Sequence, residues 1–246
     1  MNGTAVPRAA ATVMLVRDRP TAGIEVYLAR RNAHSAFMPD AYVFPGGALD
    51  DADRAPEALA LLEGSPGGVA PAYAVAALRE LFEEAGVLLA LQTDLRALDA
   101  RDVARLAGLR AKLREGDSFV GSLQALGWRL DGARLAYYSR WITPPNESRR
   151  FDACFFVARA PENQHALVDA VELHDGAWLT PQVALARNVQ DEFMLAFPTR
   201  LHLERLSAFT RVADLDRAAR ARSPIAVMPT LDAAGTISLP PELATW

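Results

Sequence analysis

Cysteine and lysine are almost missing from this chain. Cys154 is the single cysteine and Lys112 the single lysine among 246 residues. One cysteine excludes an intrachain disulfide framework. Cys154 stands in the apolar run 153–157, so we expect a thiol packed inside a strand rather than a nucleophile. Nearly every cation is therefore an arginine, whose planar guanidinium suits phosphate, although genome composition could equally explain most of them.

The chain also lacks a long apolar run and an excess of positive charge. No run approaches the ~18 residues that a membrane helix needs. The net charge is −4, with 26 basic and 30 acidic residues, which argues against broad binding to nucleic acid or anionic membranes. Arg8 and the apolar residues 9–16 resemble a short signal segment, but Arg17-Asp18-Arg19 follows where a cleavage site would stand. We expect a cytoplasmic protein without nucleic-acid or membrane partners.

The hydrophobic patterning predicts a single α/β domain over residues 1–246. A composition of 51% hydrophobic and 23% charged residues is typical of a globular protein of this length. The turn dipeptide Asp131-Gly132 predicts a hairpin between 128–130 and 135–142. Other strands are expected at 12–17, 24–30, 42–45, 151–158 and 177–179, and helices at 71–85, from Asp99 to near Gly116, at 118–126, from Thr180 and at 198–209.

An acidic ridge lies on the helix expected at 71–85. At about 100° per residue, Glu80, Glu83 and Glu84 fall within one arc of about 100°. Like charges at this spacing repel one another, and a hard divalent cation would remove the conflict. A solvated helix face is the common alternative. Two features argue against it: Arg79 is the only basic residue in the stripe, and the flexible pair Gly46-Gly47 precedes it.

The bounds of this helix follow from its end residues. Pro71 suits the first turn, and Gly86 suits the position after the last turn, where the backbone needs positive φ. The face opposite the ridge is apolar and is expected to be buried; it comprises Val75, Leu78, Leu81, Phe82 and Ala85.

The pattern G-x5-E-x7-R-E-U-x-E-E-x-G-U, with U a bulky aliphatic residue, is the signature of Nudix hydrolases, and this chain resembles that family. Gly47 matches the first glycine, and residues 79–87 match the second half. The arginine should follow that glycine by about 14 positions. Here the separation is 79 − 47 = 32, so about 18 residues are inserted, at about 54–71. Counted forward from Gly47, the glutamate position of the pattern is Asp53, which could supply the acidic side chain. Counted backward from Arg79, it is Pro71, which could not.

The flanking segments 30–39, 43–50 and 149–153 resemble the long-insert branch of the family, which includes a peroxisomal acyl-CoA diphosphatase. This resemblance implies an α/β/α sandwich with a mixed, curved sheet and added helices. It implies metal-dependent hydrolysis of a nucleoside-linked diphosphate, with CoA or acyl-CoA as the first candidate, giving 3′,5′-ADP and (acyl)phosphopantetheine. NADH, ADP-ribose or a nucleotide sugar is the alternative substrate, and a non-catalytic nucleotide-sensing module is the alternative function.

The resemblance also implies roles for individual residues. Glu80, Glu83 and Glu84 would ligate Mg²⁺ or Mn²⁺, with the carbonyl oxygen of Gly47, and Arg79 would orient the carboxylates. Glu80, Arg79 and Glu83 are thus the candidate catalytic residues. Glu80 or a loop carboxylate could be the general base. Glu172 and then Glu192 are remote candidates, although an ordinary exposed glutamate is the simpler interpretation of both.

CoA carries a 3′-phosphate, which calls for additional guanidinium groups at the site. Arg30, Arg31, Arg149 and Arg150 are the candidate substrate-binding residues, with plain surface arginines as the alternative. The helical segment at about 93–127 could wall one side of the site, serve only in packing, or form the surface of a homodimer.

Overall fold

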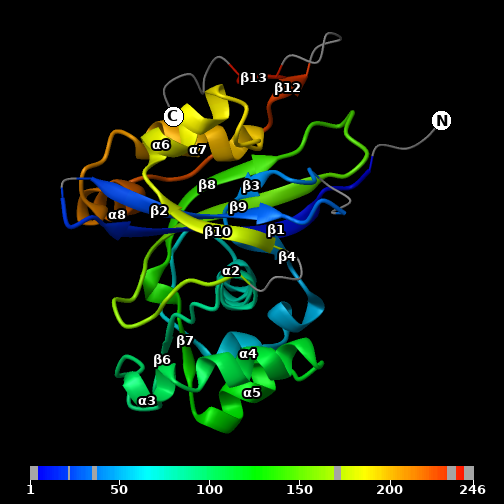
Figure 1. Cartoon of the computed structure of the whole chain (residues 1–246). Helices are drawn as coiled ribbons and strands as arrows, with labels where there is room; N and C mark the ends of the chain where they lie inside the picture. The colour runs from blue at the N-terminus through cyan, green and yellow to red at the C-terminus, as the bar shows by residue number, and fades with distance from the viewer. Residues whose placement is uncertain (1–4, 22, 35–37, 169–172, 232–236, 241–246) are drawn as a thin grey trace.

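A mixed β-sheet forms the centre of the molecule (Figure 1). The computed structural model describes residues 5–21, 23–34, 38–168, 173–231 and 237–240. Within these ranges the largest sheet has eight strands in the order β10-β2-β1-β9-β8-β11, with β3 paired to β2 and β4 to β1. Its strands are β1 (Arg8–Asp18), β2 (Ile24–Arg31), β3 (Tyr42–Val43), β4 (Gly46–Ala48), β8 (Ala136–Ile142), β9 (Phe151–Arg159), β10 (Leu173–Leu179) and β11 (Ala226–Val227).

Helices cover both faces of this open sheet (Figure 1). Helix α2 packs on one face, with α4 and α5 beyond it, and α6 and α7 lie on the opposite face. No helix in the described part of the chain is long and apolar enough to cross a membrane. The helices are α1 (Pro56–Ala60), α2 (Pro71–Ala85), α3 (Ala100–Val103), α4 (Leu106–Arg114), α5 (Phe119–Leu126), α6 (Pro181–Val189), α7 (Phe197–Leu206) and α8 (Val212–Arg220), with short 3-10 turns η1 (Asp51–Arg54) and η2 (Gly132–Arg134).

The side chains of β1 alternate between two hydrophobic clusters. Val13 and Leu15 belong to the cluster around α2, while Met14 and Val16 belong to the cluster around α7 and α8. The period of two places successive side chains on opposite faces. The expected layered α/β fold is confirmed, and we refer below to the α2 face and the α7 face of the sheet.

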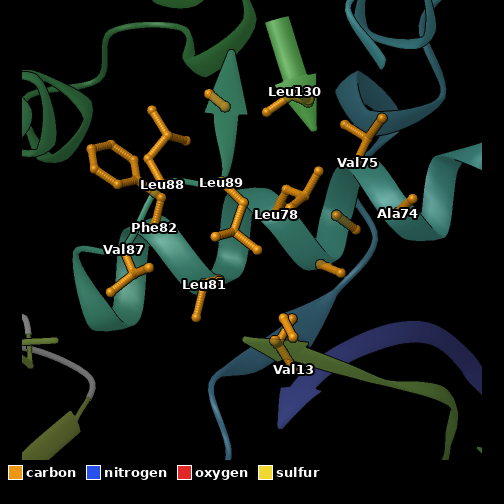
Figure 2. Packing of buried hydrophobic residues seen from close by; sticks show 14 of the residues in the cluster. Val13, Ala74, Val75, Leu78, Leu81, Phe82, Val87, Leu88, Leu89 and Leu130 are labelled. Carbon is orange, nitrogen blue, oxygen red and sulfur yellow. The ribbon is translucent and has the colours of Figure 1, made fainter. Parts of the chain in front are cut away.

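Helix α2 has the bounds and the buried face that its sequence predicts. Its first residue is Pro71, and it ends at Gly86, which has φ of 69°. Figure 2 shows Val75, Leu78 and Phe82 in the packed cluster that also includes Val13 of β1. Leu78, Leu81 and Phe82 are fully buried. Burying one such side chain stabilises the fold by about 1.5–3 kcal/mol, so the helix is held firmly against the sheet.

Strand β1 changes antiparallel partner along its length. Residues 10–12 pair with Gly46–Ala48 of β4, whereas residues 16–18 pair with β2. On its other side β1 runs parallel to β9 from Arg8 to Val16. The two partners therefore diverge, and the glycine pair lies at the fork, where β4 contacts α2.

Two sequence predictions of local structure are wrong. Residues Arg129–Asp131 form β7, which pairs with β5 (Leu62–Glu63) and β6 (Ala90–Leu91) in a separate small sheet and not with β8. Asp131-Gly132 therefore leads into η2 and not into a hairpin turn. The helix expected from Asp99 is divided into α3 and α4, although Asp99 caps α3 as expected. The remaining short strands are β12 (Thr230–Leu231) and β13 (Ile237–Ser238).

The single cysteine is a packed thiol. Cys154 is 1% exposed inside β9, and burial raises the pKa of its thiol to about 11. The thiolate is the reactive form, so this cysteine is inert at neutral pH. The expectation from its apolar neighbours is confirmed.

Candidate active site

Arg79 of α2 lies at the centre of a buried network of carboxylates. Its Nη1 donates to Oε1 of Glu80 at 2.8 Å and to Oε2 of Glu83 at 2.9 Å, and its Nη2 donates to the carbonyl of Ala48 at 3.1 Å. Burial alone would lower the pKa of Arg79, but the hydrogen bond with Asp53 and the charges of Glu80 and Glu83 raise it. The guanidinium therefore stays charged and fixes two carboxylates of the acidic ridge.

Asp53 in η1 completes this network from the other side. Its Oδ1 accepts from Nε of Arg79 and its Oδ2 from Nη2, both at 2.9 Å. Oδ2 also accepts from the backbone N of Asp50 at 2.8 Å, and the Asp53 residue is 1% exposed. Pro71, the other residue at the glutamate position of the pattern, is the first residue of α2. The structure thus places Asp53 against the arginine, in a two-point ion pair that closes the insert.

The glycine pair lies directly against the acidic ridge. The backbone N of Gly46 donates to Oε2 of Glu84 at 2.7 Å, and Glu84 is only 6% exposed. A Cβ atom added to Gly47 would lie 2.6 Å from Oε1 of Glu80, closer than van der Waals contact allows. Only glycine lets the strand approach the carboxylate this closely. The loop and the helix are therefore built as one unit.

The predicted metal ligands are brought to one end of a cavity, but not in a ready ligand geometry. Among the described residues, no group of three His, Cys, Asp or Glu side chains is arranged to hold a metal ion. The reason is that Glu80 and Glu83 turn toward Arg79, while Glu84 accepts from Gly46. Burial raises the pKa of Glu83 against the lowering effect of Arg79. The donors are carboxylate oxygens around a glycine cradle, which is the hard donor set that suits Mg²⁺ or Mn²⁺.

Arg110 of α4 holds the end of the helix that carries the ridge. Its Nε and Nη2 donate to the carbonyl of Glu83 at 2.8 and 2.6 Å, and its Nη1 donates to the carbonyl of Leu167 at 2.8 Å. Arg110 is 8% exposed. The last carbonyls of a helix lack partners within the helix, and a cation there also complements the helix dipole. No sequence pattern points to this residue as part of the site, because it stands 27 positions from its partner Glu83.

A cavity of about 1280 Å³ opens above the ridge. It is larger than the ~300–1,000 Å³ typical of small-molecule sites, so it can hold a ligand at least as large as a nucleotide. Gly46, Gly47, Glu80, Glu83 and Glu84 line one part of it. Side chains of β1, β2, β8, β9, α4 and α7 line other parts of it.

The four predicted substrate-binding arginines lie in different places. Arg31 lines the cavity. Arg30 donates to Asp40 at 2.7 Å on the opposite side of β2. Arg150 donates to the carbonyls of Thr143 and Ala5, and Arg149 is exposed; neither lines the cavity.

The remote carboxylate candidates remain predictions. Glu192 is exposed and lies 3.9 Å from Arg187. Glu172 lies outside the described residues, as do residues 35–37 of the resembling segment.

A buried histidine supports the α7 wall of the cavity. His202 is fully buried, its Nδ1 is 2.6 Å from the carbonyl of Pro198, and its Nε2 is 2.7 Å from Oγ of Ser139. A carbonyl only accepts, so Nδ1 carries the proton and Nε2 accepts from the hydroxyl. Burial lowers the pKa of His202 to about 3. The ring is thus a neutral structural element, stacked on Phe155.

Comparison with known proteins gives consistent matches. The NUDT19 Nudix domain family matches residues 64–206. The protein named acyl-coenzyme A diphosphatase NUDT19 in Gallus gallus is 29% identical over 269 residues, which cover 85% of this chain and 70% of that protein. Its namesake in Homo sapiens is 29% identical over 244 residues, covering 82% of this chain and 65% of that protein. The chain thus spans about two thirds of the length of these relatives.

A solved structure extends the match to the fold. The crystal structure of a NUDIX hydrolase from Alicyclobacillus acidocaldarius superposes with a TM-score of 0.74 at 29% identity, covering 87% of this chain and 97% of the other. The layered arrangement of sheet and helices is therefore shared over almost the whole of that protein.

Proposed function

Because this chain belongs to the NUDT19 Nudix domain family, a family of Nudix hydrolases that act on diphosphates, we propose that its substrate is CoA or acyl-CoA. The products would be 3′,5′-ADP and (acyl)phosphopantetheine. One observation carries the proposal: the carboxylates around Arg79 stand at one end of a cavity large enough for a nucleotide with a long substituent. The names of the two relatives support the CoA-type substrate.

The reaction is attack of water on phosphorus while negative charge builds on the leaving oxygen. A bound divalent cation would supply neutralisation of that charge and a more acidic attacking water. Nudix hydrolases generally need such ions, and we propose that Glu80, Glu83, Glu84 and the carbonyl of Gly47 hold them here. Mg²⁺ and Mn²⁺ are the proposed ions.

The protein's own part in this reaction is to hold charge in place. Helix α2 fixes the spacing of the carboxylates, and a helix does so better than a loop. Arg79 orients Glu80 and Glu83, while the Gly46 N–H orients Glu84. Glu80 is the first candidate for the general base, with a loop carboxylate as the alternative; Asp50 is a loop carboxylate that lines the cavity.

A panel assay tests the substrate. Purified protein is incubated with Mg²⁺ or Mn²⁺ and with CoA, acetyl-CoA, octanoyl-CoA, NADH, ADP-ribose or a nucleotide sugar, and the products are identified by mass spectrometry. We expect 3′,5′-ADP from the CoA compounds with the highest kcat/KM. Turnover of NADH, ADP-ribose or the sugar alone would overturn the CoA proposal and keep the diphosphatase chemistry.

Two isosteric variants test catalysis at the ridge. Glu83→Gln and Glu84→Gln keep the side-chain volume, and the amide oxygen of each variant can still accept the hydrogen bond that Glu83 accepts from Arg79 and Glu84 from Gly46 N–H. Each should lower kcat by about a hundredfold or more, because a neutral amide neither ligates nor orients as a carboxylate does. Wild-type protein that binds CoA compounds without hydrolysing them would support the nucleotide-sensing alternative.

A further inference from the structure

The cavity has two chemically different halves, one on each face of the sheet. We infer that the half on the α7 face, here called the apolar half, binds the acyl chain of a CoA thioester. This inference rests on the proposed function, and it assigns a binding site within the same cavity. The apolar half is lined by Ala10, Trp141, Phe151, Ala153, Phe155 and Phe197.

The floor of the apolar half is made of small residues. Ala10 of β1 and Ala153 of β9 are register partners, and Ala153 is also paired with Trp141 of β8. Phe155 and Val157 of β9 stand two and four residues after Ala153 on the same face, and they fill the core around α7. Because residues two apart share a face, the alanines leave a hollow where larger side chains would continue the core.

Aromatic rings form the walls around this floor. The rings of Trp141 and Phe197 meet edge to face with centroids 6.1 Å apart, and Phe155 stacks on the buried ring of His202. Pro229, from the chain after α8, also lines the cavity. The contacts offered to a ligand by these rings, the proline and the floor alanines are carbon. Burial of an alkyl chain against such surfaces is favourable.

Most of the charged groups that line the cavity stand on the α2 face, although Arg8 of β1, Glu147 of the loop after β8 and Arg200 of α7 also line it, and Arg200 lies over the ring of Phe197. Arg31 lies two residues beyond Ala29 of β2, which packs in the α2 cluster, so Arg31 points to that face. Arg79, Arg110 and Arg114 line the cavity from α2 and α4. The acidic ridge and four of the arginines that line the cavity stand on the α2 face, so we place the diphosphate there. The portion of a CoA thioester that needs no polar partner is its acyl chain, which the rings and alanines of the apolar half suit.

A graded filling of the floor tests the assignment. We compare kcat/KM for free CoA, acetyl-CoA and octanoyl-CoA in wild type, Ala153→Val and Ala153→Leu. The matched control is Ala213→Leu, because Ala213 is exposed on α8 and does not line the cavity. The ratio of kcat/KM for octanoyl-CoA to that for free CoA should fall about tenfold in Ala153→Leu and less in Ala153→Val. It should not change in the control.

Binding without turnover provides the second measurement. Calorimetric titration of octanoyl-CoA and free CoA in EDTA should give tighter binding of the ester to wild type, and Ala153→Leu should remove that preference. An equal loss of both ligands would overturn the inference, because the apolar half would then hold a part common to all CoA compounds, such as the base. An unchanged ratio would also overturn it.

These outcomes are separable from failure of the proposed function. Wild type that cleaves no CoA compound refutes the function by the turnover assay. The EDTA titration then still decides the apolar half, since a lost preference for the ester in Ala153→Leu supports it and a retained one overturns it. Thermal unfolding of each variant checks folding, and the valine variant gives the result if the leucine variant unfolds.

Discussion

The ion pair between Asp53 and Arg79 joins the residue just before the insert to the middle of the helix that follows it. Both side chains are almost fully buried, with exposed fractions of 2% and 9%. A buried ion pair contributes little to stability when it is compared with a well-packed apolar pair in its place. Removing only one partner is strongly destabilising, because the other charge is then buried without compensation. Asp53 is therefore more important to stability than an acidic residue on a surface turn would be.

We predict that Asp53→Asn lowers the free energy of unfolding by about 3–5 kcal/mol, because it removes one partner of a buried charge pair. Urea unfolding followed by circular dichroism measures this. The neighbouring Asp51 has a fully exposed side chain and lies 3.7 Å from Arg54, so Asp51→Asn should change stability by less than about 0.5 kcal/mol. Similar values for the two variants would contradict a structural role for Asp53.

His202 makes stability depend on pH in a defined direction. Its pKa in the folded protein is about 3, below the ~6.5 of an unfolded chain, so only the unfolded state takes up the proton between these values. This contribution is complete above pH 6.5 and is lost as the pH falls. Between pH 6.5 and 5.0, the free energy of unfolding of the wild type should fall by about 2 kcal/mol more than that of His202→Gln. One bound proton changes it by about 1.4 kcal/mol per pH unit. Equal losses in urea unfolding would refute the assignment.

The arginines proposed to bind the 3′-phosphate differ in whether they line the cavity. Arg31 lines the cavity and Arg149 does not. Arg31→Ala should raise KM for CoA at least tenfold more than KM for dephospho-CoA, since only CoA carries the additional phosphate. Arg149→Ala serves as the control and should affect both substrates alike. The same KM increase for both substrates in Arg31→Ala would rule out recognition of the 3′-phosphate by this residue.

At the scale of elements, α4 and α2 are coupled through Arg110. Three hydrogen bonds from one guanidinium reach the carbonyls of Glu83 and Leu167. The helix that carries the ridge is thus fixed at its C-terminal end by the added helical segment. Of the three interpretations of that segment, packing against α2 is what the structure describes, and Arg110 also lines the cavity.

Arg110→Ala should destabilise the protein by about 2–3 kcal/mol, because it removes charge-assisted hydrogen bonds to buried carbonyls. If Arg110 also positions the ridge, kcat should fall in Arg110→Ala while KM changes little, and Arg110→Lys should restore part of both properties. Lys112→Ala, an exposed change on the same helix, is the control. A stable Arg110→Ala variant with wild-type kcat would contradict the coupling.

Elements with local signals were predictable, and elements with remote partners were not. The bounds of α2 follow from Pro71 and Gly86, which act on their own helix ends. The hairpin at Asp131-Gly132 failed because β7 pairs with β5 and β6, and a turn dipeptide carries no information about such partners. Helix α8 was not among the predicted helices, although Val212, Leu215 and Ala219 form the buried stripe that could have indicated it.

The same division holds for the candidate site: residues on one helix were predictable, and residues that depend on distant contacts were not. Arg79, Glu80, Glu83 and Glu84 lie on one helix, so their relative positions follow from helical spacing alone. Two residues, Asp53 and Pro71, were candidates for the glutamate position of the pattern, and in the structure Asp53 is the one that pairs with Arg79. Arg110 and the apolar half depend on contacts between distant segments, and no spacing in the sequence encodes them.

For the whole molecule, we predict that a bound divalent cation stabilises the fold. A ligand that binds only the folded state raises the free energy of unfolding by about 2.7 kcal/mol when its free concentration is about 100 times its Kd. For a protein of this size that corresponds to a rise in Tm of about 5–10 °C. Differential scanning fluorimetry with MnCl₂ should show the rise in wild type and a smaller one in Glu84→Gln. Glu115→Gln, exposed at the end of α4, is the control. No shift at any concentration would argue against a metal at the ridge.

The assembly state and the cellular location stay predictions. Light scattering coupled to size exclusion distinguishes a monomer from a homodimer, and fluorescence microscopy of a tagged chain tests the expected cytoplasmic location.

The closure of the insert by Asp53 and Arg79 offers a practical site for protein engineering. Residues Ser65 and Gly67 are exposed; Gly67 has a φ of 73°, which favours glycine, so an insertion here should keep Gly67 and begin beside it. Lengthening a surface loop costs only about 0.6 kcal/mol per doubling. A fluorophore or an affinity tag inserted in this loop should therefore extend into solvent, while the ion pair between Asp53 and Arg79 still holds η1 against α2.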